Sequence, residues 1–215
     1  MNIGILGSGD VAQVLGAGFV KLGHSVKLGT RNPQAERVQA WVKLAGPRAS
    51  AGSFADAASF AEVAVLATLW TGTENAIRLA KPDNLAGKTV IDTTNPLLFT
   101  SEGLPPRLAL GTTDSAGEQV QRWLPNAHVV KAFNHVGNAN MVNPIFAGGP
   151  PDMFICGNSL QAKQTVIGFL KALGWGVIDL GGIDSSRWIE PLAMIWVVHG
   201  FRSGRWGHSF KLLHK

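Results

Sequence analysis

Cysteine and charged residues are scarce in this sequence of 215 residues. Asp, Glu, Lys and Arg make up 15% of the chain and hydrophobic residues make up 46%, so a sizeable core is available and disorder is not expected. The single cysteine, Cys156, excludes an intramolecular disulfide and a cysteine metal cluster. We expect it to serve as a small apolar residue in a strand.

The sequence also lacks a hydrophobic run long enough to cross a bilayer. The most apolar late stretch, residues 188–201, contains Glu190, Pro191 and His199 and is too short for a span. A hydrophobic strand begins at Ile3, which leaves no room for a basic secretory leader. We therefore expect a cytoplasmic protein without a membrane partner.

A concentrated basic patch is missing, although the net charge is +5 and the pI is about 9.7. The charges are scattered, and no basic run is interleaved with stacking aromatic residues, so we expect no nucleic-acid partner. Residues 202–215 carry four basic residues and no acid. We interpret this segment as a solvated tail or a subunit contact.

Common catalytic motifs are absent as well. The sequence has no spaced His/Asp/Glu metal set, no Gly-x-Ser-x-Gly elbow and no Walker phosphate loop. We therefore expect no metal site and no catalytic triad.

The N-terminus carries the most informative motif that is present. An apolar run at residues 3–6 ends in Gly-x-Gly-x-x-Ala at residues 7–12, and a helical pattern over residues 11–22 follows. The first glycine permits a tight turn, the second lets the backbone approach phosphates, and Ala12 lets helix and strand pack closely. Free N–H groups and the positive end of the helix dipole then face a pyrophosphate. The residues predicted to hold it are Gly7, Ser8, Gly9, Asp10 and Val11.

Strand and helix patterns alternate along the chain. Strands are predicted at residues 3–6, 25–28, 63–68, 89–92, 128–133, 153–156 and 177–180. Helices are predicted at residues 11–22, 33–44, 73–80, 115–124, 160–173 and 185–198, with a short one that starts at Ser53 or Asp56. This alternation is typical of a Rossmann-type, doubly wound α/β fold with a mostly parallel sheet and helices on both faces.

In such a sheet the ligand lies beyond the carboxyl ends of the strands. The segments that follow the strands are therefore the candidates for chemistry: residues 7–11, 29–32, 68–71, 93–96 and 134–138.

The end of the second predicted strand favours NADP over NAD. An NAD site usually places an acid there to bond the ribose 2′-hydroxyl, but this chain has Thr30, Arg31 and Asn32. Arg31 would attract a 2′-phosphate, and Thr30 can donate its hydroxyl. Asn32 is expected to cap the next helix, whose free N–H groups would add to the phosphate site. The alternative is a surface arginine at a strand end.

These motifs, in their order and spacing, resemble a known family. The glycine turn and residues 22–31, 90–96 and 131–134 are similar to those of the NADP oxidoreductases that depend on coenzyme F420, a deazaflavin. They are also similar to the cytosolic reductase domain of the transmembrane metalloreductases. The resemblance runs along nearly the whole chain, and it implies hydride transfer between NADP(H) and a deazaflavin (F420) or a flavin such as FMN or FAD.

The resemblance also implies positions for further site residues. Thr68, Leu69 and Trp70 would lie along the dinucleotide. The residues that would surround the nicotinamide and the acceptor ring are Asn95, Pro96, Phe133, Asn134 and Asn138. On this basis, residues 1–135 form an NADP-binding Rossmann domain. Residues 136–215 form a small C-terminal α/β extension that completes the acceptor site and contributes a dimer contact.

His135 is the candidate catalytic residue. It follows a predicted strand near the expected nicotinamide, where it could bond the acceptor ring or shuttle a proton. The alternative is a structural histidine bonded to backbone. Hydride transfer between two rings requires little else from side chains, because the cofactors carry the chemistry.

Two other functions remain open: a non-catalytic NADP-binding module, and a reductase of another small substrate. Imine and β-hydroxyacid reductases share the first domain but append a large helical domain, for which too few residues follow residue 180. An apolar last helix and the tail residues Phe210, Leu212 and Leu213 predict a homodimer.

Overall fold

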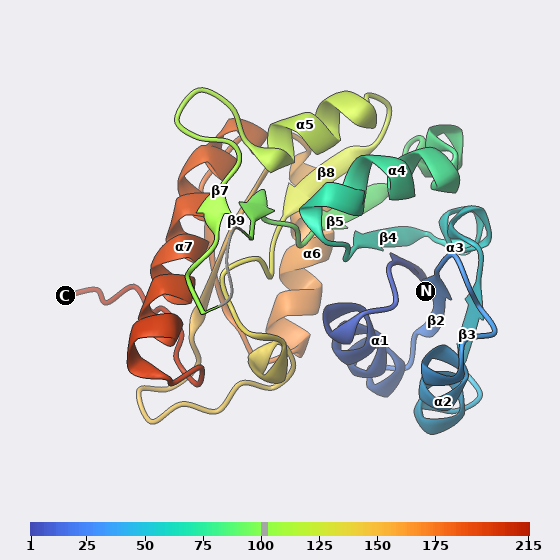
Figure 1. Cartoon of the computed structure of the whole chain (residues 1–215), viewed down its shortest axis with the longest axis horizontal. Helices are drawn as coiled ribbons and strands as arrows, with labels where there is room; N and C mark the ends of the chain where they lie inside the picture. The colour runs from blue at the N-terminus through green and yellow to red at the C-terminus, as the bar shows by residue number, and fades with distance from the viewer. Residues whose placement is uncertain (100–102) are drawn as a thin grey trace.

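The fold is built around a central eight-stranded sheet (Figure 1). A computed structural model describes residues 1–99 and 103–215 of the chain. The strand order is β10-β9-β8-β5-β4-β1-β2-β3, and the pairs from β8 to β3 are parallel. The strands are β1 (Asn2–Leu6), β2 (Ser25–Gly29), β3 (Ala49–Gly52), β4 (Val63–Leu66), β5 (Thr89–Asp92), β8 (His128–Lys131), β9 (Asp152–Gly157) and β10 (Gly176–Asp179).

Helices cover both faces of the sheet, as the alternating pattern predicts. The helices are α1 (Asp10–Lys21), α2 (Glu36–Ala45), α3 (Phe54–Phe60), α4 (Trp70–Ala80), α5 (Ala116–Trp123), α6 (Leu160–Ala172) and α7 (Ser186–Ser203). Helices α1, α2 and α6 pack on one face, and α3, α4, α5 and α7 pack on the other. This is the predicted doubly wound, mostly parallel α/β fold.

Two apolar cores lie on opposite faces of the sheet because strand side chains alternate in direction. Ile3 and Ile5 of β1 belong to the core beneath α1, α2 and α6, and Leu6 belongs to the other. Gly4, between Ile3 and Ile5 in β1, allows α3 to approach the strand closely, since a Cβ at Gly4 would lie 2.1 Å from the carbonyl oxygen of Ala57 in α3.

The C-terminal residues extend the same sheet. Strand β9 pairs antiparallel with β8, and β10 pairs parallel with β9. The long connection between β8 and β9 contains only a short 3-10 turn, η2 (Asn138–Asn140), because an antiparallel neighbour needs no crossover helix. The sheet is thus continuous across residue 135, and the domain division at that residue stays a prediction.

Several predicted boundaries are wrong. Helix α2 begins at Glu36 and not at residue 33, because Asn32 accepts a hydrogen bond from the Gln34 amide (3.2 Å) in a local turn and does not cap the helix. Helix α4 begins three residues before the predicted residue 73, and α7 extends five residues beyond 198. The edge strand β3 was not predicted, since its Ala, Ser and Gly residues have little β-propensity.

The stretch predicted as a loop at residues 95–111 contains a small antiparallel pair, β6 (Leu97–Leu98) and β7 (Arg107–Leu108). Residues 100–102 of this stretch lie outside the described residues. None of the helices in the described ranges combines the length and apolarity needed to cross a bilayer.

Candidate functional site

The two glycines of the turn between β1 and α1 have different surroundings. Gly7 has φ +142°, and a Cβ there would lie 2.1 Å from the Ala67 carbonyl oxygen, so the backbone itself requires glycine. Gly9, the N-cap of α1, has φ −76°, and a Cβ there would meet nothing within 4 Å. No side chain caps α1, so its first N–H groups are available to an anion.

The glycine turn is tied to the end of β2, where the 2′-phosphate residues are predicted. The Ser8 hydroxyl donates to Thr30 Oγ1 (3.2 Å), and the Asn32 amide reaches the same oxygen at 3.4 Å. Arg31 is exposed beside them. Arg37, in the first turn of α2, forms an ion pair with Asp10 in the first turn of α1. The structure therefore brings the predicted pyrophosphate and 2′-phosphate residues together at one edge of the sheet.

The segment after β4 is only partly arranged as expected. Leu69 is 74% exposed at the carboxyl edge, and the Thr68 and Thr73 hydroxyls lie 2.9 Å apart. The ring of Trp70, in contrast, stacks on Trp123 of α5 with the ring centroids 5.5 Å apart. Trp70 therefore packs α4 against α5, and its predicted place along the dinucleotide stays a prediction.

The ends of β5 and β8 are joined by two asparagines. Asn95 donates to the Asn134 carbonyl (2.6 Å), and Asn134 donates back to Asn95 Oδ1 (2.9 Å) and to the Ile189 carbonyl of α7 (3.2 Å). Phe133, between Asn134 and the strand, is buried with φ +63°, which turns the chain sharply toward Asn95. Pro96 is buried next to this pair, and Asn138 begins η2.

His135 lies in the interior. Its Nε2 accepts the Phe154 amide (3.1 Å), and the rings of Phe154 and Phe210 pack edge-on against it. Burial lowers the pKa of His135 to about 4, so the ring is neutral at pH 7. This geometry favours the structural alternative over the catalytic one.

A buried charge cluster lies behind the two asparagines. Lys131, the last residue of β8, has no exposed surface, and its Nζ lies 2.7 Å from Asp92 Oδ2 and 2.9 Å from Glu190 Oε1. Burial alone would lower the pKa of Lys131, but the two carboxylates raise it to about 12. We call Asp92, Lys131 and Glu190 the buried triad. The sequence did not predict this cluster. The one feature of the sequence that points to it is Lys131, a lysine inside a mostly apolar predicted strand.

Glu190 also connects the buried triad to α5. Its Oε2 accepts the Ala116 amide and its Oε1 the Gly117 amide, both at 2.9 Å. The carboxylate of α7 thereby satisfies two of the free N–H groups at the start of α5.

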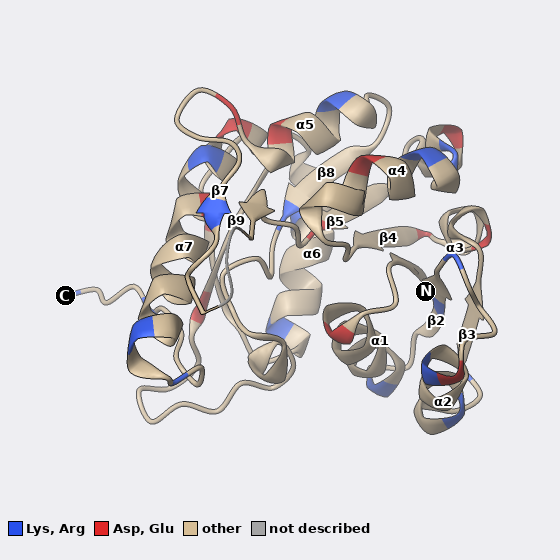
Figure 2. Cartoon of the chain, in the orientation of Figure 1, with Lys and Arg blue, Asp and Glu red and all other residues tan. Residues whose placement is uncertain are grey.

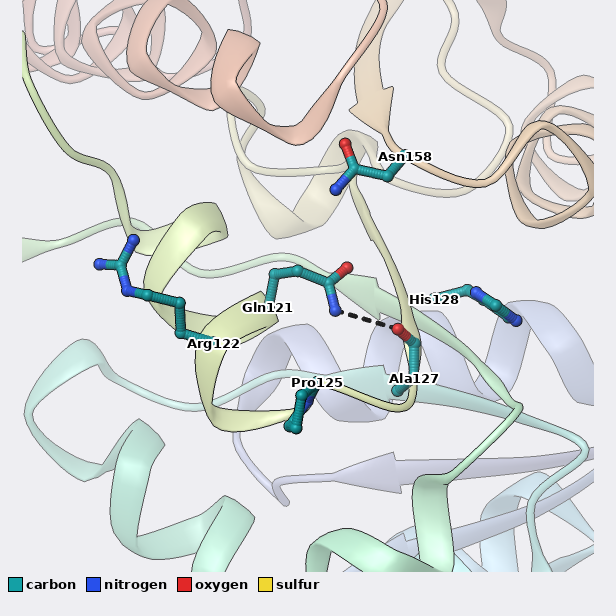
Figure 3. Close-up of a pocket in the computed structure, with 6 residues that line it drawn as sticks. All are labelled: Gln121, Arg122, Pro125, Ala127, His128 and Asn158. Carbon is teal, nitrogen blue, oxygen red and sulfur yellow. Dashed lines mark hydrogen bonds between the residues drawn. The ribbon is translucent and has the colours of Figure 1, made fainter.

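A shallow hollow of about 500 Å³ lies at the opposite edge of the sheet (Figure 3). Its lining residues come from α5, the turn that follows it, the start of β8 and the turn after β9: Gln121, Arg122, Pro125, Ala127, His128 and Asn158. The amino end of β8 lies away from the glycine turn, so this hollow is separate from the predicted site. Lys and Arg residues are spread over many of the elements (Figure 2).

Residues 2–96 match the sequence profile of the family described as NADP oxidoreductase, coenzyme F420-dependent. A crystal structure from Arthrobacter sp. FB24, described as a candidate F420-dependent NADP reductase, is 38% identical, with a TM-score of 0.92 and 99% of each chain covered. The F420-dependent NADP reductase of Methanocaldococcus jannaschii is 31% identical over 63% of this chain and 60% of that protein.

The metalloreductase STEAP3 of Rattus norvegicus is 34% identical over 90% of this chain. The matched region is 36% of that protein, so the chain spans about a third of its length.

Proposed function

The chain belongs to the family of coenzyme F420-dependent NADP oxidoreductases, and we propose that it transfers a hydride between NADP(H) and a deazaflavin or flavin. The match to the family profile and the 38% identical crystal structure confirm the resemblance seen in the sequence. The observation that carries the proposal is the uncapped N-terminus of α1, which lies behind an open Gly9 and beside Arg31.

The chain's own residues fit a dinucleotide that carries a 2′-phosphate. The N–H groups of residues 8–11 would hold the pyrophosphate, because the α1 end is free and nothing blocks the approach at Gly9. Thr30, Arg31 and Asn32 would hold the 2′-phosphate, since the end of β2 offers a hydroxyl, a guanidinium and an amide without a carboxylate.

The other half of the dinucleotide would extend over β4, β5 and β8. Leu69 would lie along it, and Asn95, Pro96, Phe133, Asn134 and Asn138 would shape the nicotinamide and acceptor region. NADPH supplies the hydride when it is bound. The protein would align two rings and exclude water, which requires no catalytic His135.

The names of two relatives favour F420 as the acceptor. The flavins FMN and FAD are the other acceptors that the sequence resemblance implies. The two alternatives are a non-catalytic NADP-binding module and a reductase of another small substrate. Mixing the NADPH-loaded protein with F420, FMN and FAD in a stopped-flow spectrometer tests the proposal against both alternatives. Loss of the NADPH absorbance with one acceptor supports the proposal, and NADPH binding without any oxidation would sink it.

The choice of NADP is tested by Arg31→Ala. Charge-assisted hydrogen bonds contribute about 1.5–3 kcal/mol each, so we expect NADPH affinity to fall by about tenfold or more, with little change for NADH. Calorimetric titration of both cofactors measures this. Arg78→Ala is the matched control, because Arg78 is exposed on α4 and, among the described residues, its side chain bonds only to Asn75. An unchanged preference for NADPH in Arg31→Ala would show that the 2′-phosphate assignment is wrong.

We further propose that the protein is a homodimer. Helix α7 exposes Trp188 and Ile195, and the tail after it exposes Leu213. Large apolar side chains left exposed on one helix and the tail beside it are typical of a subunit contact.

A further inference from the structure

The buried triad links four segments that meet at one place. Asp92 ends β5, Lys131 ends β8, and Glu190 lies in α7 and binds the start of α5. Taking three charges out of water is costly, and apolar residues of similar volume often give equal or better stability. Stability alone therefore does not account for the buried triad.

Thr94 connects the buried triad to Asn95. Lys131 Nζ donates to the Thr94 carbonyl (2.8 Å), and Asp92 Oδ1 accepts both the Thr94 amide (2.9 Å) and its hydroxyl (2.7 Å). These bonds fix the backbone on both sides of Thr94. Asn95 follows directly and is bonded reciprocally to Asn134, which in turn is bonded to Ile189, the neighbour of Glu190.

This network lies under one half of the proposed cofactor. The glycine turn and Arg31 are at the ends of β1 and β2, so the adenosine half lies there. Strands β4, β5 and β8 follow in order on the other side of β1. A dinucleotide that crosses the carboxyl edge must therefore place its nicotinamide toward β5 and β8.

We propose that Lys131 is a positioning residue for the nicotinamide. Together with Asp92 and Glu190, it fixes Thr94 and thereby holds Asn95 and Asn134 in place at the nicotinamide half of the site. Lys131 is buried and does not touch the cofactor. This inference rests on the proposed NADP(H) function. The positioning role of Lys131 is the same whether the acceptor is F420 or a flavin.

The test compares NADPH with 2′,5′-ADP, which has the adenosine and 2′-phosphate but no nicotinamide. In Lys131→Met we expect the affinity for 2′,5′-ADP to stay within about twofold of native, whereas NADPH affinity falls about tenfold. The fluorescence anisotropy of the bound nicotinamide should fall as well. With an active acceptor, the rate of hydride transfer should fall about 100-fold, because a misplacement of about 1 Å has that effect.

Lys163→Met is the matched control. Lys163 is also buried, and its Nζ bonds to a carboxylate, Asp179 (3.0 Å), and to a carbonyl, Gly181 (3.2 Å). It lies in α6 and binds the end of β10, away from the glycine turn. We expect this variant to bind both ligands as the native protein does.

Thr94→Val provides a second variant in case Lys131→Met does not fold. It removes the hydroxyl bond to Asp92 and leaves all three charges in place. We expect the same selective loss of NADPH affinity, and Thr94→Ser, which keeps the hydroxyl, should restore it.

Equal losses for both ligands, or no loss for either, would overturn the positioning role. A native protein that binds neither ligand would instead contradict the proposed function itself, so the two failures are distinguishable.

Discussion

At the scale of single residues, Gly7 and Gly9 show how one turn combines two constraints. Gly7 is fixed by the backbone, because its positive φ and the nearby Ala67 carbonyl exclude a side chain. Gly9 has an ordinary conformation and open space around it, so only the proposed ligand would exclude a methyl group there.

Gly9→Ala should therefore separate folding from binding. We expect the free energy of unfolding to fall by about 1 kcal/mol or less, because glycine is preferred over alanine at an N-cap. NADPH affinity should fall by about tenfold or more. Gly168→Ala, at an equally open position in α6, is the control and should leave binding unchanged. Unaltered NADPH binding in Gly9→Ala would contradict the phosphate approach at this turn.

His135 makes stability depend on pH. Its pKa is about 4 in the folded protein, against an ordinary value of 6.5, so the unfolded chain binds the proton more readily. The contribution of neutral His135 to the free energy of unfolding is fully present above pH 6.5. It is lost as the pH falls toward 4, and the total loss is about 3 kcal/mol.

Urea unfolding of native protein and His135→Gln at several pH values measures this. Gln Oε1 can still accept the Phe154 amide, and the variant should lose less stability than the native protein between pH 6.5 and 4. Its rate of hydride transfer at pH 7 should match the native rate. Parallel stability curves would contradict the burial argument, and a large loss of rate in a stable variant would restore the catalytic interpretation.

At the scale of elements, α3 shows a helix start that the sequence encodes well. Ser53 Oγ accepts the Asp56 amide (3.1 Å), and Asp56 Oδ2 accepts the Ser53 amide (2.9 Å), which forms a capping box. The prediction left the start of this helix at Ser53 or Asp56, and the structure has Ser53 as the N-cap. The start of α2 was mispredicted because Asn32 makes an equally local bond of another kind, to Gln34.

Ser53→Ala should lower the free energy of unfolding by about 1 kcal/mol, the usual contribution of an N-cap. Chemical denaturation measures the change. Ser59→Ala, an exposed position in the same helix, should leave stability the same or slightly higher because alanine is the better helix former. Equal effects of the two substitutions would show that the cap contributes nothing.

At the scale of the whole molecule, the apolar surface of α7 predicts the state in solution. We expect sedimentation analysis to give twice the chain mass of 22.8 kDa. Ile195→Lys, at a side chain that is 60% exposed on α7, should give monomers. Leu44→Lys is the control, because Leu44 is 88% exposed on α2 and far from this surface in the fold. A monomeric native protein would contradict the homodimer.

The sequence by itself determined the doubly wound sheet, the glycine turn and the edge at which we propose the site. These depend on local features: apolar runs of strand length, helical patterns between them, and glycines at fixed spacing. Only the tertiary structure decided that Lys131 is buried between Asp92 and Glu190, that His135 faces the interior, and that Trp70 packs on Trp123. The partners of these side chains are distant in sequence, so their contacts form only when the strands and helices pack together.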